Sequence, residues 1–153
     1  MTRIPASALL LGLAGLIPFV WAALLVIGVA DPGLTAPFAG WVALSGDGIL
    51  MMVRYGTIIL CFMSGVLWGF ATKARGARAA VGYALSVVPA LWVFLFPGAG
   101  ATSALINLMT GFAGLLILDF AFTRWRLAPA WWMSLRVLLT AIVLVCLGIG
   151  AFA

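Results

Sequence analysis

The sequence predicts an all-α integral membrane protein, one bundle of five transmembrane helices in a single domain, residues 1–153. The first observation is composition: 67% of the residues are hydrophobic and 7% are charged, against about 45–50% and 25% in soluble domains. The second is that five apolar runs, each near the roughly 20 residues that cross a bilayer, fill most of the chain. The third is that the basic residues, Arg54 excepted, lie at alternate gaps between these runs.

The placement of the basic residues predicts the orientation of the bundle. They precede the first run, separate the second from the third, and separate the fourth from the fifth: Arg3; Lys73, Arg75 and Arg78; Arg124, Arg126 and Arg136. Because cationic loops resist translocation, we expect a bacterial inner (cytoplasmic) membrane protein with a cytoplasmic N-terminus and a periplasmic C-terminus. The net charge of +5 is then topogenic, and no cationic stretch is long enough to predict binding to nucleic acid.

The five spans follow from the apolar runs in order. Between the first two, residues 34–44 are expected to form a short interfacial helix, because Thr35 can cap it and Phe38 and Trp41 give it an apolar side. A Pro-Gly-Ala-Gly turn at 97–100 separates the third span from the fourth, and Pro129 opens the last segment. The spans are expected at about residues 7–30, 49–71, 79–96, 102–122 and 131–152.

Two prolines lie inside the predicted spans. Pro18 leaves the Ala14 carbonyl without its helical partner, so we expect a kink in the first span, and Pro89 predicts a second kink in the third. The first span also resembles a signal peptide, since residues 28–30 (GVA) look like a cleavage site. Its apolar run is longer than the 7–15 residues of a signal-peptide core, so we expect it to be retained as a helix.

Small and polar residues at helical spacing mark two predicted packing stripes. On the second span, Cys61, Gly65 and Gly69 recur every four residues, which lets another helix backbone approach closely. The spacing does not say whether that helix belongs to this chain or to another. The fourth span carries a comparable stripe, which predicts hydrogen-bonded helix packing and, as the alternative, a substrate site: Asn107, Thr110, Gly111 and Gly114.

Three charged residues are candidates for ion pairs. Arg54 lies seven residues after Asp47, on the same helix face, so its guanidinium can reach outward to that carboxylate; the alternative is a ligand-binding or subunit-contact arginine. Asp119 is the one acid inside an apolar run, near Arg124, Arg126 and Arg136. We expect an ion pair that ties the fourth span to the fifth, with a proton-coupled carboxylate as the alternative.

The predicted cytoplasmic rim combines arginine with tryptophan. Arginine attracts anionic lipid headgroups, and tryptophan prefers the depth of the headgroups at a membrane surface. We expect phosphatidylglycerol or cardiolipin to bind there. The residues concerned are Arg75, Arg78, Arg124, Arg126, Arg136, Trp125, Trp131 and Trp132.

The composition also predicts which chemistry is missing. The chain has no His and no Glu, and its two cysteines, Cys61 and Cys146, lie in apolar runs without CxxC spacing. The usual haem ligands, most transition-metal sites and the commonest proton-transfer groups are therefore lacking. We expect no cofactor, no metal ion and no enzymatic activity.

Three segments together resemble the transmembrane protein 69 family, whose shared region is known as domain of unknown function 3429. They are Ile4-Pro5 with residues 11–19 (LGLAGLIPF), residues 55–69 (YGTIILCFMSGVLWG), and residues 129–132 (PAWW) leading to Leu135-Arg136 and Leu139-Thr140. The family often has Gly where this chain has Ser64 and His where it has Leu67. The resemblance implies a multi-pass bundle, found in bacterial inner membranes and in mitochondria, with no established activity.

Two functions remain open at this point. The leading hypothesis is a non-catalytic accessory subunit or assembly factor of a larger membrane complex, with a membrane protein or a second copy of the chain as its partner. It rests on the scarcity of titratable groups and on the small-residue faces. The alternative is a small transporter or lipid-handling protein, suggested by Arg54, the two prolines and the stripe around Asn107, and it predicts a water-accessible cavity at mid-membrane.

Overall fold

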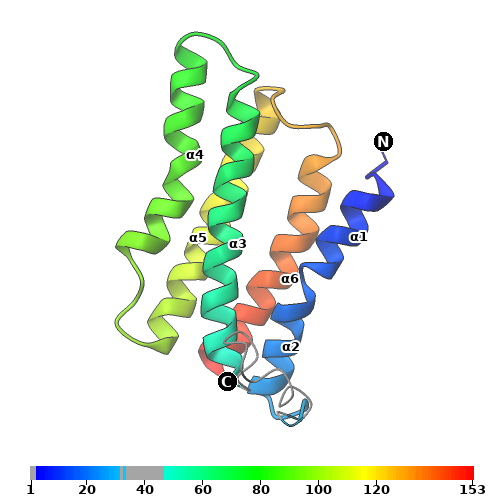
Figure 1. Cartoon of the computed structure of the whole chain (residues 1–153), viewed down its shortest axis with the longest axis vertical. Coiled ribbons are helices and arrows are strands. Elements are labelled where there is room, and N and C mark those ends of the chain that lie inside the picture. Colours follow the sequence, from blue (N-terminus) through cyan, green and yellow to red (C-terminus); the bar gives the residue numbers. More distant parts are fainter. Residues whose placement is uncertain (1–2, 32, 34–46) are drawn as a thin grey trace.

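The computed structural model describes residues 3–31, 33 and 47–153 and is helical along most of that length (Figure 1). Five stretches are long and apolar enough to cross a membrane, which confirms the predicted all-α, multi-pass fold. The interfacial helix predicted at 34–44 lies outside the described residues. The helices are α1 (Ala6–Ala14), α2 (Ile17–Val26), α3 (Gly48–Ala71), α4 (Ala77–Leu95), α5 (Ala101–Arg124) and α6 (Trp132–Phe152).

The first span consists of two helices, α1 and α2, with a break at residues 15–16. Pro18 occupies the first turn of α2, where its missing N–H and fixed φ are tolerated, so the helix restarts there. The hydroxyl of Tyr55 on α3 donates a 3.0 Å hydrogen bond to the Gly15 carbonyl at this break. The span ends at Val26, earlier than expected, because Gly28 takes a left-handed conformation (φ 71°) that closes the helix.

The kink predicted at Pro89 does not divide the third span into two helices. In contrast to the first span, α4 continues through this proline as one helix. Two hydrogen bonds between hydroxyl and carbonyl groups lie in this region. The hydroxyl of Ser64 on α3 donates to the Ser86 carbonyl, and the Ser86 hydroxyl donates to the Tyr83 carbonyl at 2.7 Å. Ser64 and Ser86 are both buried. Ser64 therefore joins α3 to α4.

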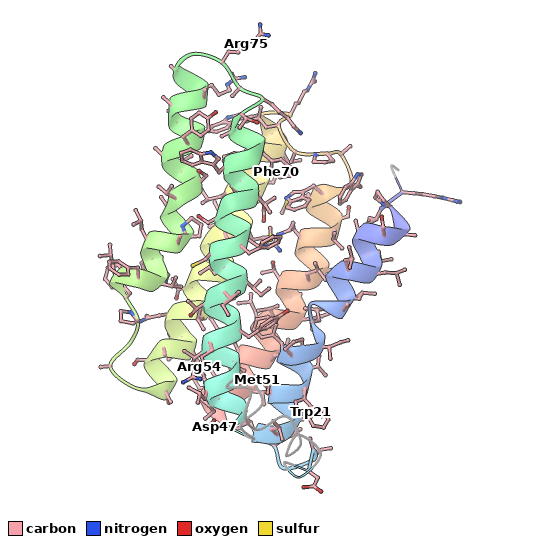
Figure 2. The ribbon with its side chains drawn as sticks, viewed as in Figure 1. Trp21, Asp47, Met51, Arg54, Phe70 and Arg75 are labelled. Atoms are coloured by element: carbon pink, nitrogen blue, oxygen red, sulfur yellow. The ribbon has the colours of Figure 1, made fainter. Side chains whose placement is uncertain are left out.

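The connections alternate between the two ends of the bundle (Figure 1). The start of α1, the α3–α4 connection and the α5–α6 connection lie at one end, called the basic end here because it carries Arg75, Arg124 at the end of α5, and Arg126. The C-terminus and the α4–α5 turn lie at the opposite end, with Asp47 and Arg54 (Figure 2). This arrangement agrees with the alternation of charge along the sequence.

The core is apolar and centres on α3, which packs against α2, α4 and α5. Phe19 from α2 contacts Tyr55 and Phe112 edge to face, with ring centroids 5.1 and 6.1 Å away. Large apolar side chains also cover the outside: Phe94 is 77% exposed and Ile117 70%. Such a surface is costly in water and suits contact with lipid.

Candidate functional site

A buried ion pair joins α5 to α6 near the basic end. Arg136 Nε donates to Asp119 Oδ2 at 2.7 Å, and the two side chains are 6% and 0% exposed. The indole Nε1 of Trp132 donates to the other carboxylate oxygen, Oδ1, also at 2.7 Å. Both oxygens of Asp119 are therefore used, as a buried carboxylate requires.

The guanidinium of Arg136 is not fully satisfied by the described residues. Its Nη2 is buried and has no hydrogen-bond partner among them, and neither has the hydroxyl of Thr140. Nε and one terminal nitrogen of arginine normally bind a carboxylate together, but Trp132 already occupies the second oxygen of Asp119. Thr140 follows Arg136 by one helical turn, so both groups lie on the same face of α6. A buried guanidinium N–H without an acceptor raises the free energy of the folded chain. An acceptor that reaches this N–H would remove that cost.

A cavity of about 140 Å³ lies beside this ion pair, lined by α1, α2, α3 and α6. Its lining includes Leu11 and Phe62, which are 75% and 64% exposed, and also the buried Phe19 and Met63. The cavity therefore leads from the lipid-facing surface into the core. Arg136 is the one charged residue among the side chains that line it. The others are Gly12, Gly15, Leu16, Ile59, Leu139 and Val143.

Arg136 was predicted to belong to the lipid-binding rim, but the structure places it inside the bundle. It is 5% exposed and bonded to Asp119, because α6 begins at Trp132 and carries Arg136 one turn into the bundle. Trp132, another predicted rim residue, also turns inward to Asp119 and packs edge to face on Phe70. The ion pair expected between the fourth and fifth spans is present, with Arg136 as the partner of Asp119.

The remaining predicted rim residues stay at the basic end. Arg75, Arg78, Arg124 and Arg126 are exposed, and the Arg124 guanidinium lies 5.9 Å from the centre of the Phe120 ring. Trp125 and Trp131 are half-buried. Lys73, which was not among the predicted lipid-binding residues, donates to the Leu127 carbonyl at 3.1 Å and so joins the two connections at this end. Headgroup binding by these residues remains a prediction.

The Asn107 stripe divides into residues that pack and residues that do not. Asn107 joins α5 to α4: its amide donates to the Phe96 carbonyl at 3.1 Å, and Trp92 Nε1 donates to the Asn107 backbone carbonyl at 2.8 Å. A Cβ on Gly111 would lie 2.6 Å from Leu60 Cδ2, so glycine permits that contact. A Cβ on Gly114 would meet no described atom within 4 Å.

The Cys61 stripe faces outward from α3. Cys61, Gly65 and Gly69 are all exposed, and a Cβ on Gly65 or Gly69 would come within 4 Å of no atom in the described part of the chain. The helix that the sequence predicts against this stripe is therefore not α1, α2, α4, α5 or α6. The large exposed side chains of Phe62 and Trp68 lie beside it on α3.

Asp47 and Arg54 lie near the N-terminal end of α3 (Figure 2). The Asp47 carboxylate caps that helix by accepting from the Leu50 backbone N–H at 3.0 Å. This role was missed by the sequence analysis, although aspartate directly before a helix is a standard capping signal. Arg54 is exposed at the opposite end from Arg136, and its pairing with Asp47 stays a prediction.

The site also contains residues that the sequence analysis missed. Tyr55 and Thr140 were not singled out, although Trp132, Arg136 and Thr140 recur every four residues and so predict one polar face on α6. The part of the chain that the structure describes brings together no group of three His, Cys, Asp or Glu side chains.

Comparisons with known proteins agree with the resemblance seen in the sequence. Residues 4–152 match the model of a family described as protein of unknown function (DUF3429). Transmembrane protein 69 of Xenopus tropicalis is 35% identical over 142 residues, which cover 90% of this chain and 51% of that protein. The chain thus spans about half the length of this relative. No solved structure matches the chain. The chain belongs to the DUF3429 family, to which the transmembrane protein 69 resemblance pointed.

Proposed function

We propose that this multi-pass membrane protein is a non-catalytic accessory subunit or assembly factor of a larger membrane complex. The observation that carries the proposal is the outward position of Cys61, Gly65 and Gly69 on α3. Lipid chains need no small residues, whereas a second helix packs closely only where side chains are small. The proposed partner is a transmembrane helix of another membrane protein, seated along this stripe. We also propose insertion in the bacterial inner membrane with the basic end in the cytoplasm.

The central place of α3 supports this role. Its other faces pack against α2, α4 and α5 and, less extensively, against α6. A partner on the stripe would therefore contact the helix that holds the bundle together, and binding would stabilise the whole chain. Substitutions in the stripe leave the bundle intact, because the space beyond Gly65 and Gly69 is open.

The test is co-purification in lipid nanodiscs from native membranes, followed by mass spectrometry. Gly65→Leu with Gly69→Leu should reduce the retained partner at least tenfold, while the melting temperature of the isolated chain stays unchanged. Gly114→Leu on α5 is the matched control, since that glycine also has open space around it, and it should retain the partner. A wild-type chain that remains monomeric in nanodiscs and in several detergents contradicts the proposal.

A second candidate, a small transporter or lipid-handling protein, is favoured by the cavity beside Arg136. Asn107, the residue first linked to that function, contributes less, because its side chain is engaged with Phe96. Transport of a polar solute requires water to reach the cavity. A cysteine at Ile59, in a chain without its native cysteines, would then react with a membrane-impermeant thiol reagent. Protection from the reagent excludes polar transport and leaves lipid handling.

A further inference from the structure

The unpartnered donor of Arg136 and the cavity beside it make a binding site for one membrane lipid. We infer that an acyl chain of an ester-linked glycerophospholipid occupies the cavity and that its ester carbonyl accepts a hydrogen bond from the Arg136 guanidinium. The inference goes beyond the accessory role and does not depend on it, although it gives the lipid-handling alternative a defined ligand class.

The charge of the site selects a neutral acceptor. Asp119 is bonded to Arg136 Nε and balances the charge of the guanidinium, and Trp132 adds a second donor to the same carboxylate. A further carboxylate or phosphate would bring an unbalanced negative charge close to Asp119 in a medium that screens charge poorly. A carbonyl oxygen accepts from the guanidinium without adding charge.

The shape and lining of the cavity select a hydrocarbon chain. About 140 Å³ is smaller than the roughly 300–1,000 Å³ of sites for whole small molecules, so the cavity has room for only part of a lipid. Apart from Arg136 the lining side chains are apolar, and they run from the exposed Leu11 and Phe62 to the buried Phe19. A chain segment can therefore enter from the lipid while the remainder of the molecule stays in the bilayer.

The depth of Arg136 matches the position of lipid esters. It follows Trp132, the first residue of α6, by four residues, or about 6 Å along the helix axis. Tryptophan prefers the boundary between headgroups and acyl chains, and Trp131 and Trp132 lie where the chain enters α6 at the basic end. Glycerol esters occupy that same boundary, so the carbonyl and the guanidinium nitrogen meet without displacing the lipid from its normal depth.

The splayed position of α1 provides the entry. α1 has no buried residue and packs mainly on α6, where Gly12 lies against Leu139. Figure 1 shows α1 diverging from the other helices above the break at residues 15–16. The cavity lies between α1 and α3 at this break, so a lipid reaches it from the side of the bundle.

The test compares ester-linked with ether-linked phosphatidylglycerol carrying the same chains. The two lipids share headgroup and charge, so the rim arginines bind them equally, and only the ester lipid has the carbonyl. In nanodiscs with equal amounts of both, native mass spectrometry of the wild-type chain should find the ester lipid retained about three- to tenfold over the ether lipid, the value of one hydrogen bond.

Two adjacent isoleucines supply the variant and its control. Ile59 lines the cavity, whereas Ile58 is 63% exposed to lipid and does not line it. Ile59→Phe should fill the cavity and abolish the ester preference, and Ile58→Phe should keep it. Asp119→Leu with Arg136→Met removes the donor without leaving a buried charge, and it should also abolish the preference.

Each outcome decides the inference. Equal retention of the two lipids by the wild-type chain overturns it, as does an ester preference that survives Ile59→Phe. Stronger retention of a free fatty acid than of the ester lipid also overturns it, because the acceptor would then be a carboxylate and not a neutral carbonyl. Failure of the partner test on α3 leaves this result untouched, since the α3 stripe and the cavity contain different residues.

Discussion

The ion pair between Asp119 and Arg136 should stabilise the bundle through strong coupling between the two residues. Asp119→Leu leaves a buried guanidinium whose Nε has lost its acceptor, and it also removes the acceptor of Trp132. Breaking a buried pair by removal of one partner costs about 3–5 kcal/mol. Arg136→Met should cost a similar amount, because the Asp119 carboxylate, 0% exposed, keeps only the indole donor.

The double variant should be less damaging than the sum of the single ones. Replacing both charges by apolar side chains of similar volume removes the desolvation cost together with the attraction, and is often neutral or stabilising. We expect Asp119→Leu with Arg136→Met to cost about 0–2 kcal/mol, so the coupling energy is at least about 4 kcal/mol. Trp132→Phe, which keeps the ring on Phe70 and loses one hydrogen bond, should cost about 0.6–1.7 kcal/mol.

The assay is reversible unfolding in mixed micelles of a mild detergent and dodecyl sulfate, followed by circular dichroism. The four chains of the cycle are compared at one detergent concentration, and the free energy of unfolding is taken from each transition. Additive single effects, with a double variant that loses about 6 kcal/mol or more, would refute the reasoning. Single variants as stable as the wild-type chain would refute it too.

Two further predictions concern packing and the rim. Gly111→Ala places a methyl group 2.6 Å from Leu60 Cδ2 and should destabilise the bundle by about 1–3 kcal/mol in the same assay. Gly114→Ala, with open space, should cost nothing, and equal losses would contradict the assigned faces. Neutralising Arg124 and Arg126 together, both exposed, should reduce the anionic lipid retained in native mass spectrometry, whereas unchanged lipid would remove the proposed rim site.

The spans and their alternation could be predicted because both depend on local properties of the chain. Hydropathy over about 20 residues defines a helix in lipid, and the basic residues define which connections share an end. The break in the first span could be predicted from Pro18, although it lies at residues 15–16. The ring of proline clashes with the turn before it, and its missing N–H removes a hydrogen bond to that turn. The helix is therefore disturbed in the preceding turn more than at the proline itself.

The candidate site was less predictable because it depends on how the helices are rotated. The sequence places three arginines near Asp119, and only the packing of α6 on α5 selects Arg136. Gly111 and Gly114 are equally small and lie one turn apart, yet a Cβ on Gly111 would lie 2.6 Å from Leu60 Cδ2 and a Cβ on Gly114 would meet no described atom within 4 Å. Residue size predicts where close approach is possible, while the helix rotation decides where it occurs.

The contrast between α1 and the remaining helices has a consequence for how the chain assembles in the membrane. The most extensive contacts join α3 to α4 and α5 to α6, each a hairpin of consecutive helices. Such hairpins can form as soon as their helices are inserted, because little chain entropy is lost in closing a short connection. None of the residues of α1 is buried. It should therefore dock last and open first, and native-state hydrogen exchange would find its amides the least protected of the bundle.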